Sequence, residues 1–212
     1  MAFDTQPQLE NEELLLQALE EKDFEALYAV ASDPGIWEQH PNKERWKRDV
    51  FTTFFEGAMQ SKGAFKVIEK NTGKIIGCTR FYDYREEENS VLIGYTFYAR
   101  SCWGKGINPQ VKRLMLNHAF RHVSKVFFHV GANNLRSRIA IERLGATKTT
   151  ETEIAYHGEA SRMNCIYLLE RKDWLSREHL PEKYSLIFTG TEAGGASSAF
   201  AKKILPEGQD KQ

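Results

Sequence analysis

The chain has 212 residues, with 41% hydrophobic and 27% charged side chains, and its 29 basic residues balance its 29 acidic ones. A chain of this size and composition is expected to form one globular core rather than two full domains. The charge balance gives no reason to expect nucleic acid or a membrane surface as a partner.

The cysteines and the N-terminus indicate a reduced, cytoplasmic protein. Cys78, Cys102 and Cys165 are widely spaced and odd in number, so a secreted disulfide framework is not expected. They match no zinc-ligand spacing, and we expect no metal. The N-terminus lacks the basic start and apolar stretch of a signal peptide, and no apolar run approaches the roughly 20 residues that span a bilayer.

The first half of the chain alternates strand-like and helix-like segments. In chain order we predict a strand at 12–20, helices at 21–32 and about 44–60, and strands at 64–69, 74–84 and 90–99. The sequence Asp33-Pro34-Gly35 ends the first helix. The connections "KNTGK" and "REEEN" between the last three strands are short, which predicts antiparallel neighbours.

The second half continues with a helix at 109–122, a strand at 125–130, a helix at 135–144 and two strands, "KTTETEIAY" and "RMNCIYLLE". This order is typical of an α+β fold, here with a mixed sheet of about seven strands flanked by helices. We assign residues 1–180 to one domain. Residues 181–212 are expected to form a C-terminal tail, partly flexible because 189–199 are rich in Gly, Ser and Ala.

The stretch "SCWGKGIN" at 101–108 predicts an anion-binding turn. Asn108 is a favoured N-cap and Pro109 suits the first helical position, so we expect a helix to begin here. Its free N–H groups and positive dipole end would face the turn, where Gly104 and Gly106 let successive amides point inward. Such a turn fits a diphosphate. A tight turn that needs its glycines only for steric reasons is an equal alternative.

Residues 93–120, which contain this turn, resemble the acetyl-CoA-binding segment of the GNAT superfamily of N-acetyltransferases. The signature of that segment is Gln/Arg-x-x-Gly-x-Gly/Ala, and Gly104 and Gly106 match its last two positions. Ser101 stands at the first position, which is a departure, with Arg100 one place away. Because the loop acts through backbone amides, this change leaves the binding mechanism in place.

A second segment, 133–146, resembles the Asn-x-x-Ser…Glu-x-x-Gly helix of the ribosomal-protein N-acetyltransferase branch of that superfamily. Its matching residues, in order, are Asn134, Ser137, Glu142 and Gly145. The resemblance covers roughly residues 9–175. Two motifs at this distance, in the expected strand order, are more specific than either motif alone.

The resemblance implies a splayed sheet that binds acetyl-CoA as co-substrate, without a metal. The pantetheine arm would lie between the fourth and fifth strands and hydrogen-bond to backbone near residues 96–98. Contacts with the coenzyme are expected from Thr96, Phe97, Tyr98, Trp103, Gly104, Lys105, Gly106, Ile107, Asn108, Asn134 and Ser137.

The same resemblance implies a general acid on the second helix. Asn134 and Ser137 are one helical turn apart and can face one cleft. Asn134 would bind the coenzyme arm, and Ser137 would donate a hydrogen bond to its sulfur. The alternative is a plain N-cap and a surface hydroxyl. Many relatives carry a tyrosine, as general acid, at the position of Ile141. Its absence here makes Ser137 the favoured candidate for that role.

No residue is a decisive general base in the sequence. Glu153 and His129 are the two named candidates, and each has a plain alternative as a solvated or structural strand residue. Asp83 and Tyr84 could act through water. Ordered water could also serve alone.

We therefore expect an acetyl-CoA-dependent N-acetyltransferase that acts by direct attack of a primary amine, either a protein N-terminus or a small molecule, without a covalent enzyme intermediate. One alternative is a longer acyl donor such as succinyl-CoA, held by Arg80 or Arg136. Others are a non-catalytic acyl-CoA-binding module and a domain whose glycine turn binds nothing. A homodimer is compatible with the sequence. The loops at 37–62, 84–90 and 157–162 contain no motif that identifies the acceptor.

Overall fold

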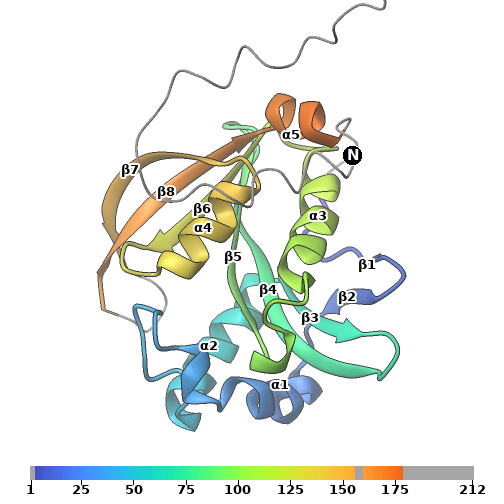
Figure 1. Ribbon diagram of the computed structural model, residues 1–212, viewed down its shortest axis with the longest axis vertical. Helices are drawn as coiled ribbons and strands as arrows, with labels where there is room; N and C mark the ends of the chain where they lie inside the picture. Colours follow the sequence, from blue (N-terminus) through green and yellow to red (C-terminus); the bar gives the residue numbers. More distant parts are fainter. Residues whose placement is uncertain (1–2, 156–159, 179–212) are drawn as a thin grey trace, which may run out of the picture. The chain divides into compact units, whose positions relative to one another are not determined.

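The computed structural model describes residues 3–155 and 160–178, and the predicted tail at 181–212 lies outside them. The fold is α+β, as predicted, with one mixed sheet in the order β1-β2-β3-β4-β5-β6-β8-β7 (Figure 1). The strands are β1 (Leu9–Glu10), β2 (Leu14–Ala18), β3 (Ala64–Glu69), β4 (Lys74–Arg85), β5 (Ser90–Tyr98), β6 (Lys125–Gly131), β7 (Thr147–Ile154) and β8 (Arg162–Glu170).

In the described part of the chain, five helices cover the sheet. They are α1 (Phe24–Ala31), α2 (Arg48–Ser61), α3 (Ile107–Ala119), α4 (Leu135–Arg143) and α5 (Arg171–Glu178). Short 3₁₀ turns at Glu21–Asp23, Pro34–Ile36 and Arg100–Cys102 precede α1, follow it and follow β5. Every predicted strand is present, and β1 and α5 are additions that the sequence pattern did not predict.

The start of α3 corrects the sequence prediction. The helix begins at Ile107, with Gly106 as its N-cap in the left-handed conformation (φ 73°). Asn108 does not cap the helix, because its Oδ1 accepts a hydrogen bond from the Tyr98 hydroxyl at 3.2 Å. Pro109 therefore lies within the first turn, where its missing N–H still costs no helical hydrogen bond.

Strands β3 to β5 form the predicted antiparallel meander, and β2 pairs antiparallel with β3. The meander is irregular between β4 and β5, where the register shifts between Cys78 and Arg80. Opposite this shift, Tyr95 has a φ of 51°, an unusual value for a bulky residue. A β-bulge of this kind bends a strand and redirects its side chains.

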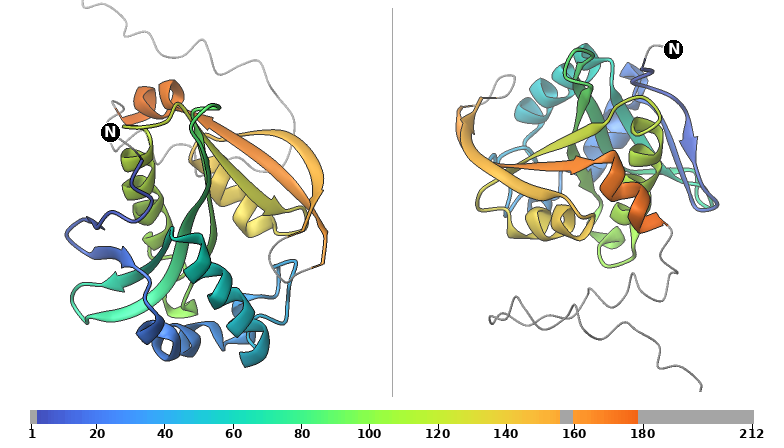
Figure 2. Two further views of the ribbon diagram at one scale, coloured as in Figure 1. Left: turned by 180° about the vertical axis from the view of Figure 1, so that it is seen from behind. Right: turned by 90° about the horizontal axis from the view of Figure 1, so that it is seen from above.

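Hydrophobic cores lie on both faces of the sheet. One face packs against α1, α2 and Trp37, with Phe51 fully buried. The other face packs against α3, α4 and α5 around Met115 and Phe128. Figure 2 shows the same division, with α2 on one side of the sheet and α3 and α4 on the other.

The described helices include none that is both long and apolar enough to cross a membrane. In the same residues, no group of three or more His, Cys, Asp or Glu side chains could hold a metal ion.

Candidate active site

The two central strands part soon after they begin. β5 and β6 run parallel but pair only at Ser90–Lys125, Val91–Val126 and Leu92–Phe127. Beyond that point β6 continues to pair with β8 on its other side, and β5 continues to pair with β4. The strands therefore diverge toward their carboxyl ends (Figure 1), and the splayed sheet implied by the resemblance is present.

The divergence leaves one edge of β5 with backbone groups that face the gap. The Ala99 amide donates to the Ile76 carbonyl at 2.8 Å, across the Gly77–Tyr98 pair. In an antiparallel ladder this places the N–H and C=O of Tyr98 itself away from β4, and so toward the gap. An extended chain can hydrogen-bond to such an edge as an added strand does.

The glycine turn before α3 has the conformation that an anion site needs. Gly104 and Gly106 have φ values of 75° and 73°, which disfavour any residue with a side chain. A Cβ placed on either glycine would meet no atom within 4 Å. Backbone conformation, not crowding, therefore requires glycine here. The space beside the turn is open, and the first amides of α3 point toward it.

The other residues of β5 and of the turn before α3 that were predicted to contact the coenzyme are either exposed or buried in the cores. Lys105 is exposed, whereas Phe97 and Ile107 are buried and pack in the two cores. The Thr96 hydroxyl lies 2.8 Å from that of Thr79. Thr96, Phe97 and Ile107 can thus contribute backbone to a ligand, but their side chains are engaged in the protein.

Trp103 spans the mouth of the gap. Its indole N–H donates to the Tyr98 carbonyl at 3.3 Å, and its ring stacks on Arg136 of α4, with the guanidinium carbon 3.9 Å from the ring centre. The Arg136 side chain also donates to the Ile36 carbonyl. These contacts bring together the turn before α3 and the first turn of α4, the two segments that carry the sequence motifs.

Two polar side chains lie at the start of α4, and only one of them makes a hydrogen bond with the described residues. Asn134 is the N-cap, and its Oδ1 accepts from the Ser137 amide at 3.2 Å. Its side-chain amide remains a donor. The Ser137 hydroxyl is half-buried and makes no hydrogen bond with any described residue. Ile141 has a hydrocarbon side chain that packs in the core, and it cannot act as an acid.

The two candidate bases lie in different places. His129 is on β6, beside the gap, and its Nδ1 is buried without a partner among the described residues. Burial lowers the pKa of His129, against the influence of Asp83, so the ring is neutral at pH 7. Glu153 is exposed on β7, two strands beyond β6 in the sheet. The structure brings His129, not Glu153, to the gap.

Two basic side chains near the gap are buried, and the sequence analysis did not predict this burial. Lys112 of α3 donates to the hydroxyls of Thr96 (2.7 Å) and Thr79 (3.2 Å), and burial lowers its pKa to about 7. Arg80 of β4 is 4% exposed. No sequence signal marks their burial, because each stands in a pattern that also fits a solvent-exposed position.

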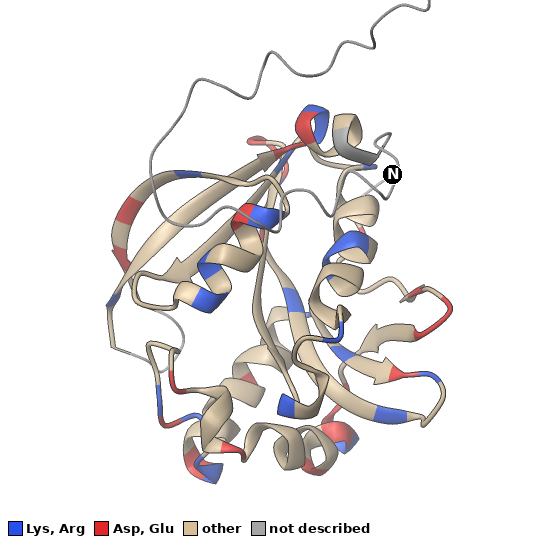
Figure 3. Ribbon diagram, in the orientation of Figure 1, with Lys and Arg blue, Asp and Glu red and all other residues tan. Residues whose placement is uncertain are grey.

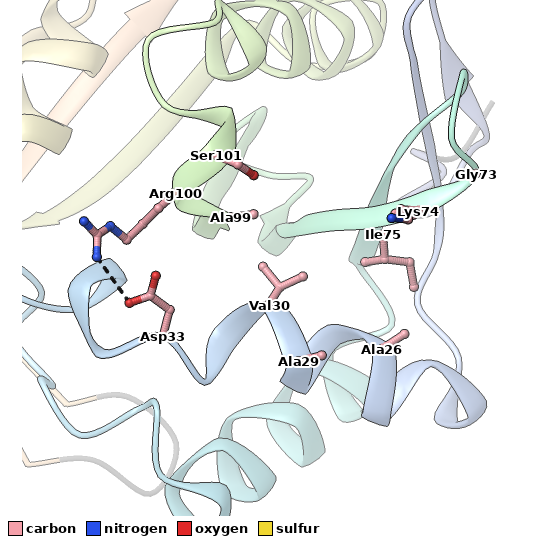
Figure 4. Close-up of a pocket in the computed structure, with 10 residues that line it drawn as sticks. All are labelled: Ala26, Ala29, Val30, Asp33, Gly73, Lys74, Ile75, Ala99, Arg100 and Ser101. Carbon is pink, nitrogen blue, oxygen red and sulfur yellow. Dashed lines mark ion pairs between the residues drawn. The ribbon is translucent and has the colours of Figure 1, made fainter.

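A surface hollow of about 640 Å³ lies beside the gap rather than in it (Figure 4). It is bounded by α1, the start of β4 and residues 99–101, and Arg100 pairs with Asp33 across it at 3.6 Å. None of the α4 residues lines it. The candidate site is therefore the gap, where the two motifs meet.

Figure 3 shows basic positions on α3 and α4, the two helices beside the gap, and acidic positions on β7 and near the end of α4. The basic positions on the two helices favour an anionic ligand between them.

Residues 13–147 match the family model described as an acetyltransferase (GNAT) domain. The chain belongs to this family. It is accordingly an N-acetyltransferase, and the family's chemistry is acyl-CoA-dependent acetyl transfer. No curated protein matches the sequence.

Solved structures support the GNAT fold at low sequence identity. A GCN5-related N-acetyltransferase from Brucella melitensis has a TM-score of 0.69 at 17% identity, covering 80% of this chain and 81% of that one. Spermidine N-acetyltransferase from Vibrio cholerae, in complex with CoA and spermine, has 0.61 at 16%, covering 78% and 99%. Mycobacterium smegmatis RimJ, in complex with CoA-disulfide, has 0.60 at 16%, covering 82% and 88%.

Proposed function

We propose that this GNAT protein transfers the acetyl group of acetyl-CoA to a primary amine by direct attack, without a covalent enzyme intermediate. The observation that carries the proposal is the gap between β5 and β6. The turn before α3 and the first turn of α4 meet at its mouth through the Trp103–Arg136 contact. A thioester held in such a gap is accessible to a second substrate from the opposite face of the sheet.

The donor would be held mainly by backbone. The diphosphate of CoA fits the amides of the turn and first helical residues, Gly104 to Asn108, and the pantetheine arm fits the edge of β5 at Tyr98. Lys105 is exposed beside the turn and can contact a phosphate. The Asn134 side-chain nitrogen makes no hydrogen bond with the described residues and can donate to the arm. Donor binding would displace the Trp103 indole from the Tyr98 carbonyl.

Ser137 would supply the proton, or a hydrogen bond, to the sulfur of the departing thiolate. Its hydroxyl makes no hydrogen bond with the described residues, and its own amide is fixed by the Asn134 cap. The cap fixes the Ser137 backbone at the start of α4, and the bound sulfur would orient the hydroxyl for proton transfer.

His129 would accept the proton of the attacking amine. The ring is neutral at pH 7, its Nδ1 has no partner in the described chain, and it lies on the α1–α2 face of the sheet. The donor motifs lie at the other face. The two substrates would thus meet in the gap from opposite sides.

The acceptor is proposed to be a protein N-terminus or a small-molecule amine. The α4 motif favours the ribosomal-protein branch, and structures of both kinds resemble this chain: RimJ and a putative ribosomal-protein-serine acetyltransferase, and spermidine N-acetyltransferase. A second hollow, about 370 Å³, lies between residues 38–43 and Ala132–Asn133, where an acceptor could enter.

Release of free CoA from acetyl-CoA, measured against a panel of peptides and small amines, tests this function. We expect turnover with at least one amine and formation of its N-acetyl product. In a binding control, CoA at 100 times its Kd should stabilise the fold by about 2.7 kcal/mol. Stabilisation without turnover on any amine would contradict the proposal.

A further inference from the structure

Arg80 is a buried cation with half of its hydrogen-bonding capacity unused. Its Nη1 donates to the Gly57 carbonyl of α2 at 3.0 Å. Its Nε and Nη2 are buried and have no hydrogen-bond partner among the described residues. Leaving donors of a charged group unmatched in the protein interior is costly, so such atoms call for a partner.

The two unmatched donors form the side of the guanidinium that binds carboxylates. Nε–H and Nη2–H are parallel and lie in one plane, which fits the two oxygens of a carboxylate. Aromatic rings lie over the group, with the guanidinium carbon 4.0 Å from the ring centre of Tyr95 and 5.6 Å from that of Phe54. These rings cover the face of the guanidinium, whereas the unmatched Nε and Nη2 lie on its in-plane edge.

The protein does not neutralise Arg80 with an acid in the described chain. No ion pair to Arg80 is present there, and the nearby Cys78 thiol stays neutral because burial raises its pKa to about 11. A second cation, Arg45, lies over the same Phe54 and Tyr95 rings, at 4.9 and 5.9 Å. Within the described residues, the positive charge of Arg80 itself is therefore not offset by an acid.

Strand register places Arg80 beside the reaction gap. Tyr82, Leu92 and Phe127 form one row across β4, β5 and β6. Two residues further along the same strands, Arg80 pairs with Gly94, and His129 lies at the same level across the gap. Because side chains alternate along strands, Arg80 and His129 face the same side of the sheet.

The same two residues hold every buried side-chain polar atom that lacks a partner within residues 3–155 and 160–178. These atoms are Nε and Nη2 of Arg80 and Nδ1 of His129. The Tyr82 ring contacts the Tyr95 ring at 5.0 Å and the His129 ring at 6.3 Å, and the Tyr95 ring lies over Arg80. A ligand whose anion reaches Arg80 while its amine reaches His129 would give all three atoms a partner.

We propose that Arg80 binds a carboxylate of the amine acceptor, so that the substrate class is an amine that also carries a carboxylate, such as an amino acid or short peptide. The inference rests on the proposed function and narrows it. A carboxylate on the acyl donor, as in succinyl-CoA, has the same chemistry, and the test separates the two sources.

The test compares each of the common amino acids with its carboxamide, first with acetyl-CoA and then with succinyl-CoA, in the unaltered protein. We expect kcat/KM with acetyl-CoA to be at least about tenfold higher for the preferred acid than for its amide, the effect of one lost charged hydrogen-bonding pair. This comparison does not depend on the folding of any variant.

The Arg80→Gln variant should lose that discrimination, mainly through KM of the acid, and should bind CoA as tightly as the unaltered protein. Arg121→Gln, at an exposed arginine after α3 that does not act on His129, is the control and should keep it. Equal acetylation of acids and amides would overturn the inference alone. So would a defect of Arg80→Gln that follows succinyl-CoA instead of the acceptor. Failure to acetylate any amine would instead overturn the proposed function.

Discussion

At the scale of single residues, the proposed chemistry depends most on Ser137. Replacing Ser137 by alanine should lower kcat by about 100-fold or more, the usual range for a general acid, with little change in the KM of acetyl-CoA. Steady-state kinetics at saturating amine measures this. Ser176→Ala, on the exposed side of α5, should have no effect. Full turnover of Ser137→Ala would exclude the role.

The pH dependence of the reaction tests His129. Because burial lowers its pKa, the ring loses its ability to accept a proton only as the pH falls below 6.5. We expect kcat/KM to decrease on that acid side, with its midpoint below 6.5. The neighbouring charges that face the ring are Asp83 and Arg85.

His129→Gln should lower kcat/KM by about 100-fold and remove that acid limb, since glutamine does not titrate. His122→Gln, at a half-buried histidine that packs against Phe3 and His118, serves as control and should keep the profile. An unchanged acid limb in His129→Gln would assign the titration to another group.

At the scale of elements, the turn before α3 offers a well-matched pair of variants. Gly106 and Gly73 both have positive φ, 73° and 66°, and a Cβ on either would meet no atom within 4 Å. An alanine at either position should cost a similar 1–2 kcal/mol of folding stability. Only Gly106→Ala should also weaken CoA binding, measured by calorimetry. Equal CoA affinity in both variants would contradict the anion-binding role.

Sequence periodicity predicted most elements because their buried faces repeat regularly. The strands 64–69 and 162–170 agree with β3 and β8 residue for residue. β1 has two residues, too few to show a period. α5 is mostly charged, and only Trp174 is buried among its described side chains.

The site was predictable where it depends on local conformation and not where it depends on packing. Gly104 and Gly106 could be read from the sequence, because only glycine adopts their φ without strain. The burial of Arg80 could not, because it is produced by α2, whose Gly57 carbonyl and Phe54 ring meet Arg80 from a segment more than 20 residues earlier.

At the scale of the whole molecule, Lys112 links the stability of the fold to pH. Its pKa is about 7 in the folded protein, against 10.5 normally. Between these values the unfolded chain binds one more proton, so this group raises the free energy of unfolding by about 1.4 kcal/mol per pH unit as pH rises. The same group contributes no slope below pH 7.

Lys112→Met should therefore be more stable than the unaltered protein at pH 6, and the difference should shrink as the pH approaches 10. The Thr79 and Thr96 hydroxyls remain bonded to each other. Urea unfolding at several pH values measures the difference. Lys125→Met, an exposed lysine on β6, is the control. A difference that stays constant with pH would show that Lys112 is charged in the folded state.

The central claim is that the acyl donor lies between β5 and β6 with its diphosphate on the turn before α3. A crystal structure with acetyl-CoA tests it most directly. The account predicts phosphate oxygens within hydrogen-bonding distance of the Gly104 and Gly106 amides, and the pantetheine arm bonded to Tyr98 in place of the Trp103 indole. A donor bound in the hollow beside α1, with the gap closed, would contradict it.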